Sequence, residues 1–253
     1  MPSASSSDWD GTTYDRISDP QLAWAGPVIE RLQLRGDEVV LDAGCGSGRV
    51  TELLVAALPH GRVIAVDGSA KMLEVARERL GARVELIESN LLDLQLDHPV
   101  DAVFSNAVFH WIRDHRRLFS RLAGLLVRNG RLEAQCGGKG NVADFKAAAA
   151  EQIATRRWAP YFVDWEPAWR FAGPKRTEKR LLESGFADAS CSLLAAPTPI
   201  ADPVPHLKTV CANPYLERIP AAEADRFVAE LRTRLPDPLI LDHVRLNISA
   251  RRR

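Results

Sequence analysis

A loop with three glycines lies between two acidic residues, and these residues are the part of the sequence best suited to hold a ligand. The apolar run 39–41 ends at Asp42, and Gly44, Gly46 and Gly48 follow at alternate positions before a helical pattern begins. Glycine allows tight turns and lets the backbone approach a ligand with no Cβ in the way. In open α/β sheets, ligands bind at the carboxyl ends of strands, where such a loop would lie.

The spacing of the glycines separates two classes of cofactor. Dinucleotide-binding loops have the pattern G-x-G-x-x-G, which brings the pyrophosphate to the N-terminus of the following helix. This loop has G-x-G-x-G, with Arg49 in the sixth position and Asp42 two residues before the first glycine. A carboxylate there would repel a pyrophosphate, but it would suit a cofactor that carries an amino group and a sulfonium. A purely structural glycine turn is the alternative interpretation.

Asp67 ends the next apolar run, 63–66, and lies 23 residues after Gly44. An acid at this point of a neighbouring strand can accept hydrogen bonds from both hydroxyls of a ribose. Capping of the following helix is the alternative role, but Ser69 already fits that position. Together with the loop, Asp67 predicts a site for a cofactor that contains a ribose.

Alternating strands and helices must position this loop. Apolar runs at 39–41, 62–66, 84–87, 101–105 and 131–135 predict strands, and helices are predicted from residue 19, at 50–58, at 69–80 and at 114–127. The pair Gly26-Pro27 predicts a kink or a restart in the first helix. This alternation indicates right-handed βαβ units and a mostly parallel sheet with both faces covered.

The pattern becomes irregular after residue 136. Residues 137–173 are rich first in glycine, then in alanine, then in aromatics, with six aromatic side chains between 158 and 171. The aromatic stretch predicts a lid over a substrate, and the alternative is that the rings only pack a small subdomain. Arg156, Arg157 and Arg170 lie beside it and could pair with an anionic substrate. Helices are expected at 175–184, near 207 and at 221–235, and strands at 190–196 and 241–248.

The composition disfavours several classes of protein. The 253 residues include 33 Lys and Arg and 33 Asp and Glu, so the net charge is zero and a nucleic-acid-binding surface is disfavoured. No apolar run approaches the roughly 20 residues that span a bilayer, and no apolar signal segment follows Met1. The scattered cysteines (Cys45, Cys136, Cys191 and Cys211) fit neither a disulfide framework nor a zinc site. We therefore expect a cytoplasmic protein, monomeric or homodimeric, with no nucleic-acid or membrane partner.

Two segments of the first half, 41–48 and 105–111, carry a resemblance to a known family, the class I S-adenosylmethionine-dependent methyltransferases. They are Leu41-Asp42-Ala43-Gly44-Cys45-Gly46-Ser47-Gly48 and Ser105-Asn106-Ala107-Val108-Phe109-His110-Trp111, with Trp9 and Tyr14 in the lead-in. Over residues 9–135 the chain is most similar to the trans-aconitate methyltransferase-like group of small-molecule enzymes. The resemblance implies a doubly wound, mostly parallel seven-stranded sheet with an antiparallel last strand and a helical, aromatic-rich substrate cap.

The resemblance also implies a division of the chain and a set of site residues. The serine-rich start of the sequence predicts a flexible tail at 1–8. The resemblance implies one domain at 9–253, with a cofactor-binding core at 36–136 and cap insertions at 9–35, 137–173 and 197–240. Asn90 stands where family members usually place an acid that accepts from the adenine amino group, and its side-chain carbonyl can accept the same bond. The expected cofactor-binding residues are Asp42, Gly44, Gly46, Gly48, Asp67, Asn90, Leu91 and Asn106, and the expected pocket residues are Trp9, Trp111 and Trp165.

Two residues are candidates for a direct part in methyl transfer, an in-line displacement in which alignment and desolvation supply much of the catalysis. His110 follows the fourth predicted strand and could act as a base, orient a carboxylate, or simply pack in its loop. Tyr14 could close over the sulfonium, as a donor or with its ring face, or serve ordinary packing.

The expected function is O-methylation of the carboxylate of a small organic acid, with S-adenosylmethionine converted to S-adenosylhomocysteine. The alternatives are C- or N-methylation of a small metabolite and a catalytically silent cofactor-binding scaffold. Amino-methylating DNA enzymes carry Asn/Asp-Pro-Pro-Tyr after the fourth strand, where this chain has Ser105-Asn106-Ala107-Val108. No metal is expected, because no acidic cluster suited to magnesium is evident, and the glycine spacing disfavours a nicotinamide oxidoreductase.

Overall fold

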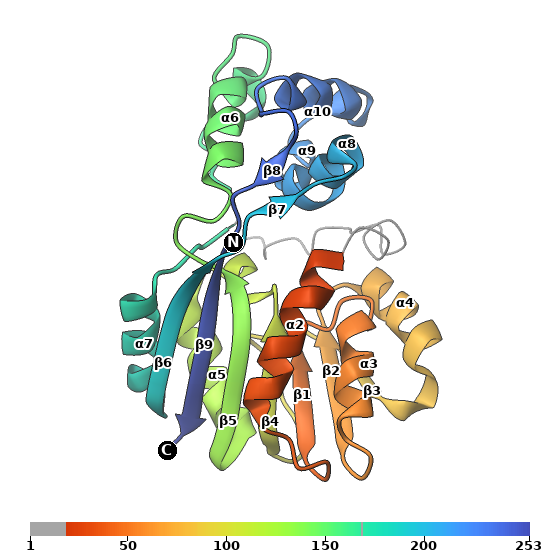
Figure 1. Cartoon of the computed structure of the whole chain (residues 1–253), viewed down its shortest axis with the longest axis vertical. Coiled ribbons are helices and arrows are strands. Elements are labelled where there is room, and N and C mark those ends of the chain that lie inside the picture. Colours follow the sequence, from red (N-terminus) through yellow and green to blue (C-terminus); the bar gives the residue numbers. More distant parts are fainter. Residues whose placement is uncertain (1–18, 168) are drawn as a thin grey trace.

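A seven-stranded sheet forms the body of the protein. A computed structural model describes residues 19–167 and 169–253, so the predictions for Trp9 and Tyr14 lie outside the described residues. The strands follow the order β3-β2-β1-β4-β5-β9-β6 (Figure 1). Their bounds are β1 Val39–Ala43, β2 Arg62–Asp67, β3 Glu85–Glu88, β4 Val100–Asn106, β5 Leu126–Gly137, β6 Phe186–Ala195 and β9 Val244–Arg252.

The directions of the strands bring both halves of the chain to one edge of this sheet. Strands β1 to β5 pair in parallel, whereas β9 runs antiparallel between β5 and β6. The predicted mostly parallel sheet with an antiparallel last strand is therefore confirmed. Because β9 is antiparallel, its first residues lie beside the carboxyl ends of its neighbours, and Arg245 pairs with Gly137 at the end of β5.

Helices cover both faces of the sheet, as the alternating pattern predicts. One face packs against α2, α3 and α4 through a core that includes Leu54, Leu73 and Phe104. The opposite face packs against α5 and α7 through residues such as Leu122 and Leu181. The bounds of these helices are α2 Asp19–Leu32, α3 Arg49–Ala56, α4 Ala70–Leu80, α5 His115–Leu125 and α7 Pro174–Glu183.

In the first half, the predicted restart at Pro27 and one predicted helix boundary are wrong. Helix α2 runs without a restart through Pro27. Its side chain Val28 is fully buried, and we attribute the continuity to such packing, which offsets the hydrogen bond that proline cannot donate. Helix α5 ends at Leu125 instead of residue 127, because Leu126 already pairs with Val100 at the start of β4.

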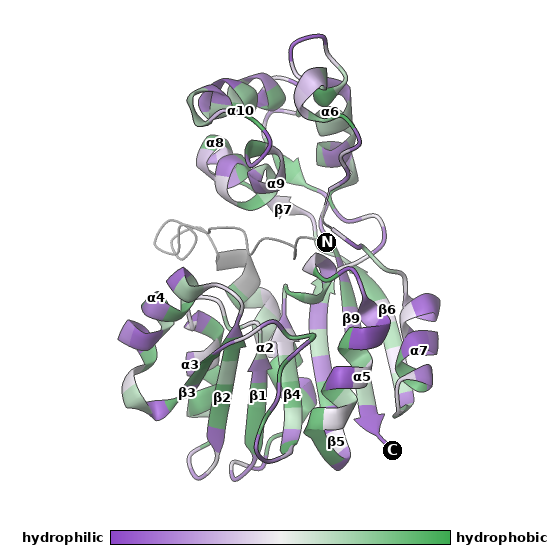
Figure 2. Ribbon diagram, turned by 180° about the vertical axis from the view of Figure 1, so that it is seen from behind, coloured by the Kyte–Doolittle hydropathy of each residue, from purple (hydrophilic) through white to green (hydrophobic). Residues whose placement is uncertain are grey.

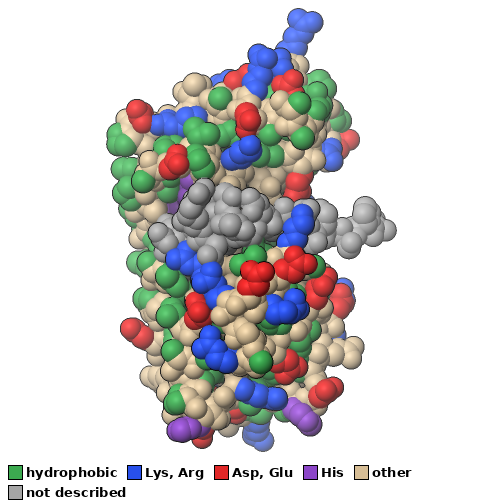
Figure 3. Space-filling view, turned by 90° about the vertical axis from the view of Figure 1, so that its right-hand side faces the viewer, with side chains coloured by type: hydrophobic (Ala, Val, Ile, Leu, Met, Phe, Trp, Pro, Cys, Tyr) green, Lys and Arg blue, Asp and Glu red, His purple; other side chains and the backbone are tan. Residues whose placement is uncertain are grey.

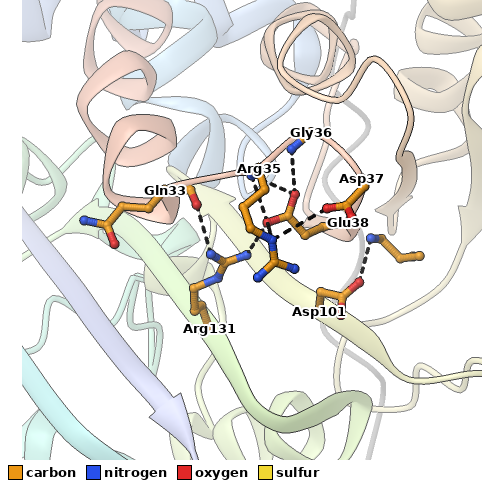
Figure 4. A network of polar contacts seen from close by, with 8 residues as sticks. Gln33, Arg35, Gly36, Asp37, Glu38, Asp101 and Arg131 are labelled. Atoms are coloured by element: carbon orange, nitrogen blue, oxygen red, sulfur yellow. Dashed lines mark hydrogen bonds and ion pairs between the residues drawn. The ribbon is translucent and has the colours of Figure 1, made fainter.

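A buried carboxylate anchors the end of β1 that lies away from the glycine loop (Figure 4). Glu38 accepts hydrogen bonds from the backbone amides of Arg35 and Gly36, and from Arg131 Nη2 at 2.8 Å. Burial by itself raises the pKa of Glu38, but these hydrogen bonds outweigh it and lower the pKa to about 2. The strand that carries the glycine loop is thus held firmly at its far end.

A smaller, mainly helical cap lies above the carboxyl edge of the sheet (Figures 1 and 2). It has its own core, in which Trp158 meets Phe227 with ring centroids 5.0 Å apart. The stretch 241–248, predicted as one strand, is divided between β8 in the cap and β9 in the sheet. The cap elements are α6 Ala143–Ile153, the 3-10 turn Ala159–Tyr161, β7 Thr198–Pro199, α8 Pro203–His206, the π-helical turn Leu207–Cys211, α9 Asn213–Leu216, α10 Ala224–Arg232 and β8 Ile240–Leu241.

Charges of both signs are interspersed on the face seen in Figure 3, in keeping with the net charge of zero. Across residues 19–167 and 169–253, no helix is long and apolar enough to cross a membrane. Within the same ranges, no group of three or more His, Cys, Asp or Glu side chains is placed to hold a metal ion.

Candidate functional site

The glycine loop joins the end of β1 to the start of α3, as predicted. Gly44, Gly46 and Gly48 all have positive φ angles, of 96°, 54° and 81°, which favour glycine. A Cβ on Gly44 would lie 2.2 Å from Val108 Cγ2, so this position also needs glycine for close packing. A Cβ on Gly46 would meet nothing within 4 Å. Gly44 therefore holds the loop against the chain beyond β4, while Gly46 borders open space.

Asp67 at the end of β2 is bonded directly to this loop. Its Oδ2 accepts from the Gly46 amide at 2.9 Å, and its Oδ1 accepts from the Ser69 amide at 2.9 Å. Burial raises the pKa of Asp67, and these amides partly offset that effect. Ser69 Oγ accepts from the Met72 amide and so caps α4. The helix thus has its own cap, and the Asp67 carboxylate faces the loop, as a ribose-binding acid would require.

Asp42 is a buried carboxylate, 1% exposed, below the loop. Its Oδ2 accepts from Thr51 Oγ1 at 2.7 Å. Burial raises the pKa of Asp42 to about 7 and the negative charge of Asp67 adds to this, while the Thr51 hydrogen bond opposes it. A cationic group placed beside this carboxylate would therefore be strongly attracted to it.

A cavity connects Asp42 and part of the glycine loop with the end of β4, and neither Asp67 nor Gly48 is among its lining residues. Its walls include Leu22 of α2, Asp42, Gly46, Phe104 and Asn106. Asp42 and Phe104 are paired in the sheet, so their side chains lie on the face that α2 covers. The cavity thus brings together the predicted Asp42, Gly44, Gly46 and Asn106, which come from β1, the loop and β4.

His110 lies just beyond β4, in the 3-10 turn Phe109–Trp111, and is 8% exposed. Its Nδ1 accepts from the Gly137 amide at 3.2 Å. Burial, with smaller contributions from Arg245, His115 and His243, holds the pKa of His110 well below its usual range. A neutral imidazole that accepts at Nδ1 carries its proton on Nε2 and is a hydrogen-bond donor there. This arrangement favours an orienting role for His110 over a role as base.

The aromatic side chains divide between the site and the interior of the cap. Trp111 lies 5.2 Å from His110 and 5.8 Å from Trp169, measured between ring centroids, at the junction of core and cap. Trp165 instead packs against Tyr215 at 4.8 Å, beside the core of the cap. Most of the predicted lid is therefore cap core, which was the alternative interpretation.

Two of the three arginines beside the aromatic stretch, Arg157 and Arg170, have partners within the protein. Arg157 pairs with Glu223 at 2.6 Å on the cap surface, and Arg170 pairs with Glu166 at 3.7 Å. Their predicted pairing with a substrate gains no support from these contacts. Arg245, which contributes to lowering the pKa of His110, falls within the predicted strand 241–248 and is not among the candidate residues that the sequence offers. Its charge beside His110 was not visible in the local sequence.

The predicted adenine contacts lie after β3. Asn90 is exposed, and its Oδ1 accepts from the Leu92 amide at 2.9 Å, which caps a turn. A carbonyl oxygen has a second lone pair, so this bond leaves Asn90 able to accept another. Leu91 is buried, with 6% of its surface exposed. The role of both residues toward adenine stays a prediction.

Comparison with known proteins finds similarities within the first half of the chain. Residues 40–130 match the family described as methyltransferase domain. The chain is 40% identical over 128 residues to a trans-aconitate 2-methyltransferase of Rhodopseudomonas palustris (strain BisB18), which covers 51% of this chain and 50% of that relative. The chain thus spans about half the length of the curated relatives it matches.

Solved structures share the fold over most of the chain. The YcgJ protein from Bacillus subtilis has a TM-score of 0.63 at 17% identity, covering 90% of this chain and 97% of its own. Phosphoethanolamine N-methyltransferase 2 of Haemonchus contortus, solved with S-adenosyl-L-methionine, has a TM-score of 0.63 at 18% identity, covering 96% of this chain and 56% of its own. At these identities the likeness establishes the fold alone.

Proposed function

We propose that this chain is a class I S-adenosylmethionine-dependent methyltransferase that methylates a carboxylate of a small organic acid. The state of His110 carries the choice of a carboxylate, since its Nδ1 accepts from the Gly137 amide. A phenol or a carbon acid needs a general base, and an imidazole with its proton on Nε2 offers none there. A carboxylate is already ionised and needs none.

The residues around the cavity fit S-adenosylmethionine. The Asp42 carboxylate is buried and suits the ammonium group of the methionine portion. The open space beside Gly46 lets backbone approach the ligand closely. Asp67 is held at the loop by two backbone amides and keeps lone pairs for the ribose hydroxyls. The similarity to trans-aconitate 2-methyltransferases over half of the chain supports an organic acid as acceptor.

When bound, S-adenosylmethionine supplies an electrophilic methyl group on a sulfonium. The protein's part is then to align an acceptor oxygen with that group and to exclude water. His110 Nε2–H can hold one carboxylate oxygen so that the other is directed toward the donor. Trp111 and Phe171, which both contact the His110 ring, shield this position from solvent.

Thermal unfolding with added ligands tests the cofactor. S-adenosylhomocysteine, S-adenosylmethionine and NADH are added separately, and a ligand at about 100 times its Kd stabilises by about 2.7 kcal/mol. We expect a shift with both adenosyl-sulfur compounds and none with NADH. A shift with NADH alone, or no shift in protein free of co-purified cofactor, would contradict the proposal.

A panel of acceptors with radiolabelled methyl donor tests the reaction. We expect label in base-labile esters of small di- and tricarboxylic acids. Label that appears only on nitrogen or carbon would contradict a carboxylate as the methyl acceptor, but it would leave the cofactor assignment intact.

A further inference from the structure

Arg245 is a buried cation at the edge of the sheet where the proposed acceptor would lie. It is the second residue of β9 and is only 3% exposed. Its register partner is Gly137, the residue whose amide donates to His110. Arg245 and His110 therefore both adjoin Gly137, although they are far apart in the sequence.

The guanidinium is held in a fixed plane. Its Nε donates to Gln135 Oε1 at 3.2 Å, and its central carbon lies 4.2 Å from the ring centroid of Trp24. Gln135 in turn donates from Nε2 to Asn247 Oδ1 at 2.8 Å. With Nε directed at Gln135, the terminal Nη1–Nη2 edge has the geometry that binds a carboxylate through two parallel hydrogen bonds.

The side chains around Arg245 suit an anion. Its charge contributes, after burial, to lowering the pKa of His110 and of His243, which falls to about 3. Both imidazoles are thus neutral and provide polar groups without a competing charge. His243 lies 5.1 Å from Trp24 between ring centroids, and its Nδ1 is 3.0 Å from Thr198 Oγ1.

A second observation comes from the cap side of this cluster. His206 is 5% exposed, and its buried Nε2 has no hydrogen-bond partner among the described residues. Burial lowers the pKa of His206 to about 4. A buried polar nitrogen without a partner is costly unless a ligand or water satisfies it. The polar cluster of Arg245, His243 and His206 thus extends from the sheet edge into the cap.

Arg245 also lies on the same face of the sheet as the cofactor cavity. Asn106, which borders the cavity, pairs with Gln135 in the sheet, and Gln135 is the hydrogen-bond partner of Arg245. Adjacent strands are about 4.8 Å apart and residues along a strand about 3.3 Å apart, so Asn106 and Arg245, two strands apart and offset by two residues, are about 12 Å apart along the sheet. That span matches a small organic acid with more than one carboxylate.

We propose that Arg245 is a specificity-determining residue that binds a carboxylate of the acceptor other than the one that is methylated. This inference rests on the proposed function, because it assumes an organic acid as acceptor. The acceptor is then a di- or tricarboxylate, and a monocarboxylate of similar length is a poor substrate.

The charge balance of the reaction shows why the bound carboxylate is not the reacting one. A carboxylate oxygen forms a bond to the methyl carbon, the carbon–sulfur bond breaks with its electron pair kept by sulfur, and a neutral ester and a neutral thioether result. An ion pair between Arg245 and the reacting carboxylate would weaken toward the transition state and slow the reaction. A second carboxylate keeps its charge throughout, so Arg245 binds ground state and transition state alike and affects KM more than kcat.

Steady-state kinetics of Arg245→Gln test this role, with trans-aconitate and the monocarboxylate crotonate as acceptors. We expect KM for trans-aconitate to rise roughly 10- to 100-fold with kcat changed little, since a charge-assisted contact is lost. For crotonate, wild type and variant should be equally poor. Arg251→Gln is the matched control, because Arg251 lies on the same strand, is exposed, and sits at its other end.

A binding measurement separates this inference from the proposed function. Calorimetric titration with tricarballylate, in the presence of saturating S-adenosylhomocysteine, reports the anion site without any methyl transfer. We expect binding to the wild type and to Arg251→Gln, and a loss of at least tenfold in Arg245→Gln. Unchanged affinity in a variant that still binds S-adenosylhomocysteine would overturn the inference, even if carboxylates are methylated.

A third variant covers the case in which Arg245→Gln does not fold. Arg245→Lys keeps the buried charge but lacks the two-pronged geometry. It should show an intermediate loss with trans-aconitate and none with crotonate, and equal losses for both acceptors would contradict the proposal. If the wild type binds tricarballylate but methylates no carboxylate, the proposed function fails and the anion site stands.

Discussion

Replacing Asp42 by asparagine tests the cofactor site most directly, because this buried carboxylate has a pKa raised to about 7. Asparagine keeps the size of the side chain and an oxygen that can accept from Thr51 Oγ1, but it removes the charge. If Asp42 binds the ammonium group of the cofactor, the substitution removes a charge-assisted hydrogen bond worth about 1.5–3 kcal/mol. The affinity for S-adenosylhomocysteine at pH 8 should fall accordingly, by roughly 10- to 150-fold.

The pH dependence of binding gives a sharper test. The ammonium group pairs with the ionised form of Asp42, so below pH 7 binding has to release the proton that the free protein holds. The Kd of the wild type should therefore rise about tenfold between pH 8 and pH 6. Asp42→Asn lacks this contribution, while any contribution from Asp67, whose pKa is also raised, remains in both proteins. The difference between the two proteins isolates Asp42.

Although Asp42→Asn should weaken cofactor binding, it should increase the stability of the ligand-free protein. The pKa of Asp42 in the folded state is raised from 3.8 to about 7, so its protonated form contributes to the stability of the fold at low pH. This contribution is lost as pH rises through 7. At about 1.4 kcal/mol per pKa unit, ionised Asp42 costs the ligand-free protein at most about 4 kcal/mol at pH 8. Asp42→Asn should thus raise the free energy of unfolding at pH 8 and raise it less near pH 5.

Calorimetric titration from pH 6 to pH 8 and urea unfolding at pH 5 and pH 8 measure both effects. Asp97→Asn, which changes an exposed residue in a loop, is the control. It should match the wild type in both the titration and the unfolding experiment. Equal pH slopes of Kd in wild type and Asp42→Asn, or a destabilised variant at pH 8, would refute the assignment of Asp42.

Other substitutions test the remaining parts of the site and fold. Asp67→Ala should weaken S-adenosylhomocysteine binding by about 1.5–3 kcal/mol in calorimetry, and unchanged affinity would remove Asp67 from the ribose site. Gly44→Ala, which adds overlap at a positive φ, should lower the free energy of urea unfolding by more than about 1 kcal/mol. Gly124→Ala, in the last turn of α5 with open space for a Cβ, should raise it by up to about 0.5–1 kcal/mol. Trp158→Ala should lower the stability of the cap by about 3–5 kcal/mol in urea unfolding, yet leave the affinity for S-adenosylhomocysteine unchanged.

The strand–loop–helix units of the first half could be predicted because local sequence specifies them. Leu54 and Leu58 mark a buried helical face, and both belong to the same buried core. Ser69 caps α4 as expected, and Gly81 with positive φ ends it. The glycine loop could be predicted for the same reason, since the φ angles that it needs are available to glycine and rarely to other residues.

The cap could not be predicted because its elements depend on contacts between distant residues. Gln152 of α6 donates to the Phe227 carbonyl of α10, 75 positions away in sequence, and Trp158 donates from Nε1 to Glu230 Oε2 at 2.7 Å. Hydrophobic periodicity in a sequence predicts which side of a helix or strand is buried, but not which element covers that side. An aromatic-rich stretch therefore has the same sequence pattern whether it forms a lid or the core of a subdomain.

Arg245 shows the same limit at the site itself. The alternation of Val244, Leu246 and Ile248 with polar residues predicts a strand, but it does not show what lies against the polar side. In the structure that side lies under α2, where Trp24 stacks on the guanidinium. The position of β9 between β5 and β6, which brings Arg245 beside His110, follows from the sheet order and not from any local pattern.

The two buried charges, Asp42 and Arg245, would let the proposed site bind ionic ligands and still favour their reaction. Asp42 on β1 and Arg245 on β9 lie on the same face of the sheet, on either side of Asn106. Each would bind a charge that the reaction leaves unchanged, an ammonium at one end and a second carboxylate at the other. Between them, methyl transfer consumes one positive and one negative charge, and a surrounding of low polarity favours such a step because the transition state is less charged than the reactants. Trp111, Phe171 and neutral His110 provide that surrounding, so a charged His110 would weaken both the alignment of the acceptor and the driving force for transfer.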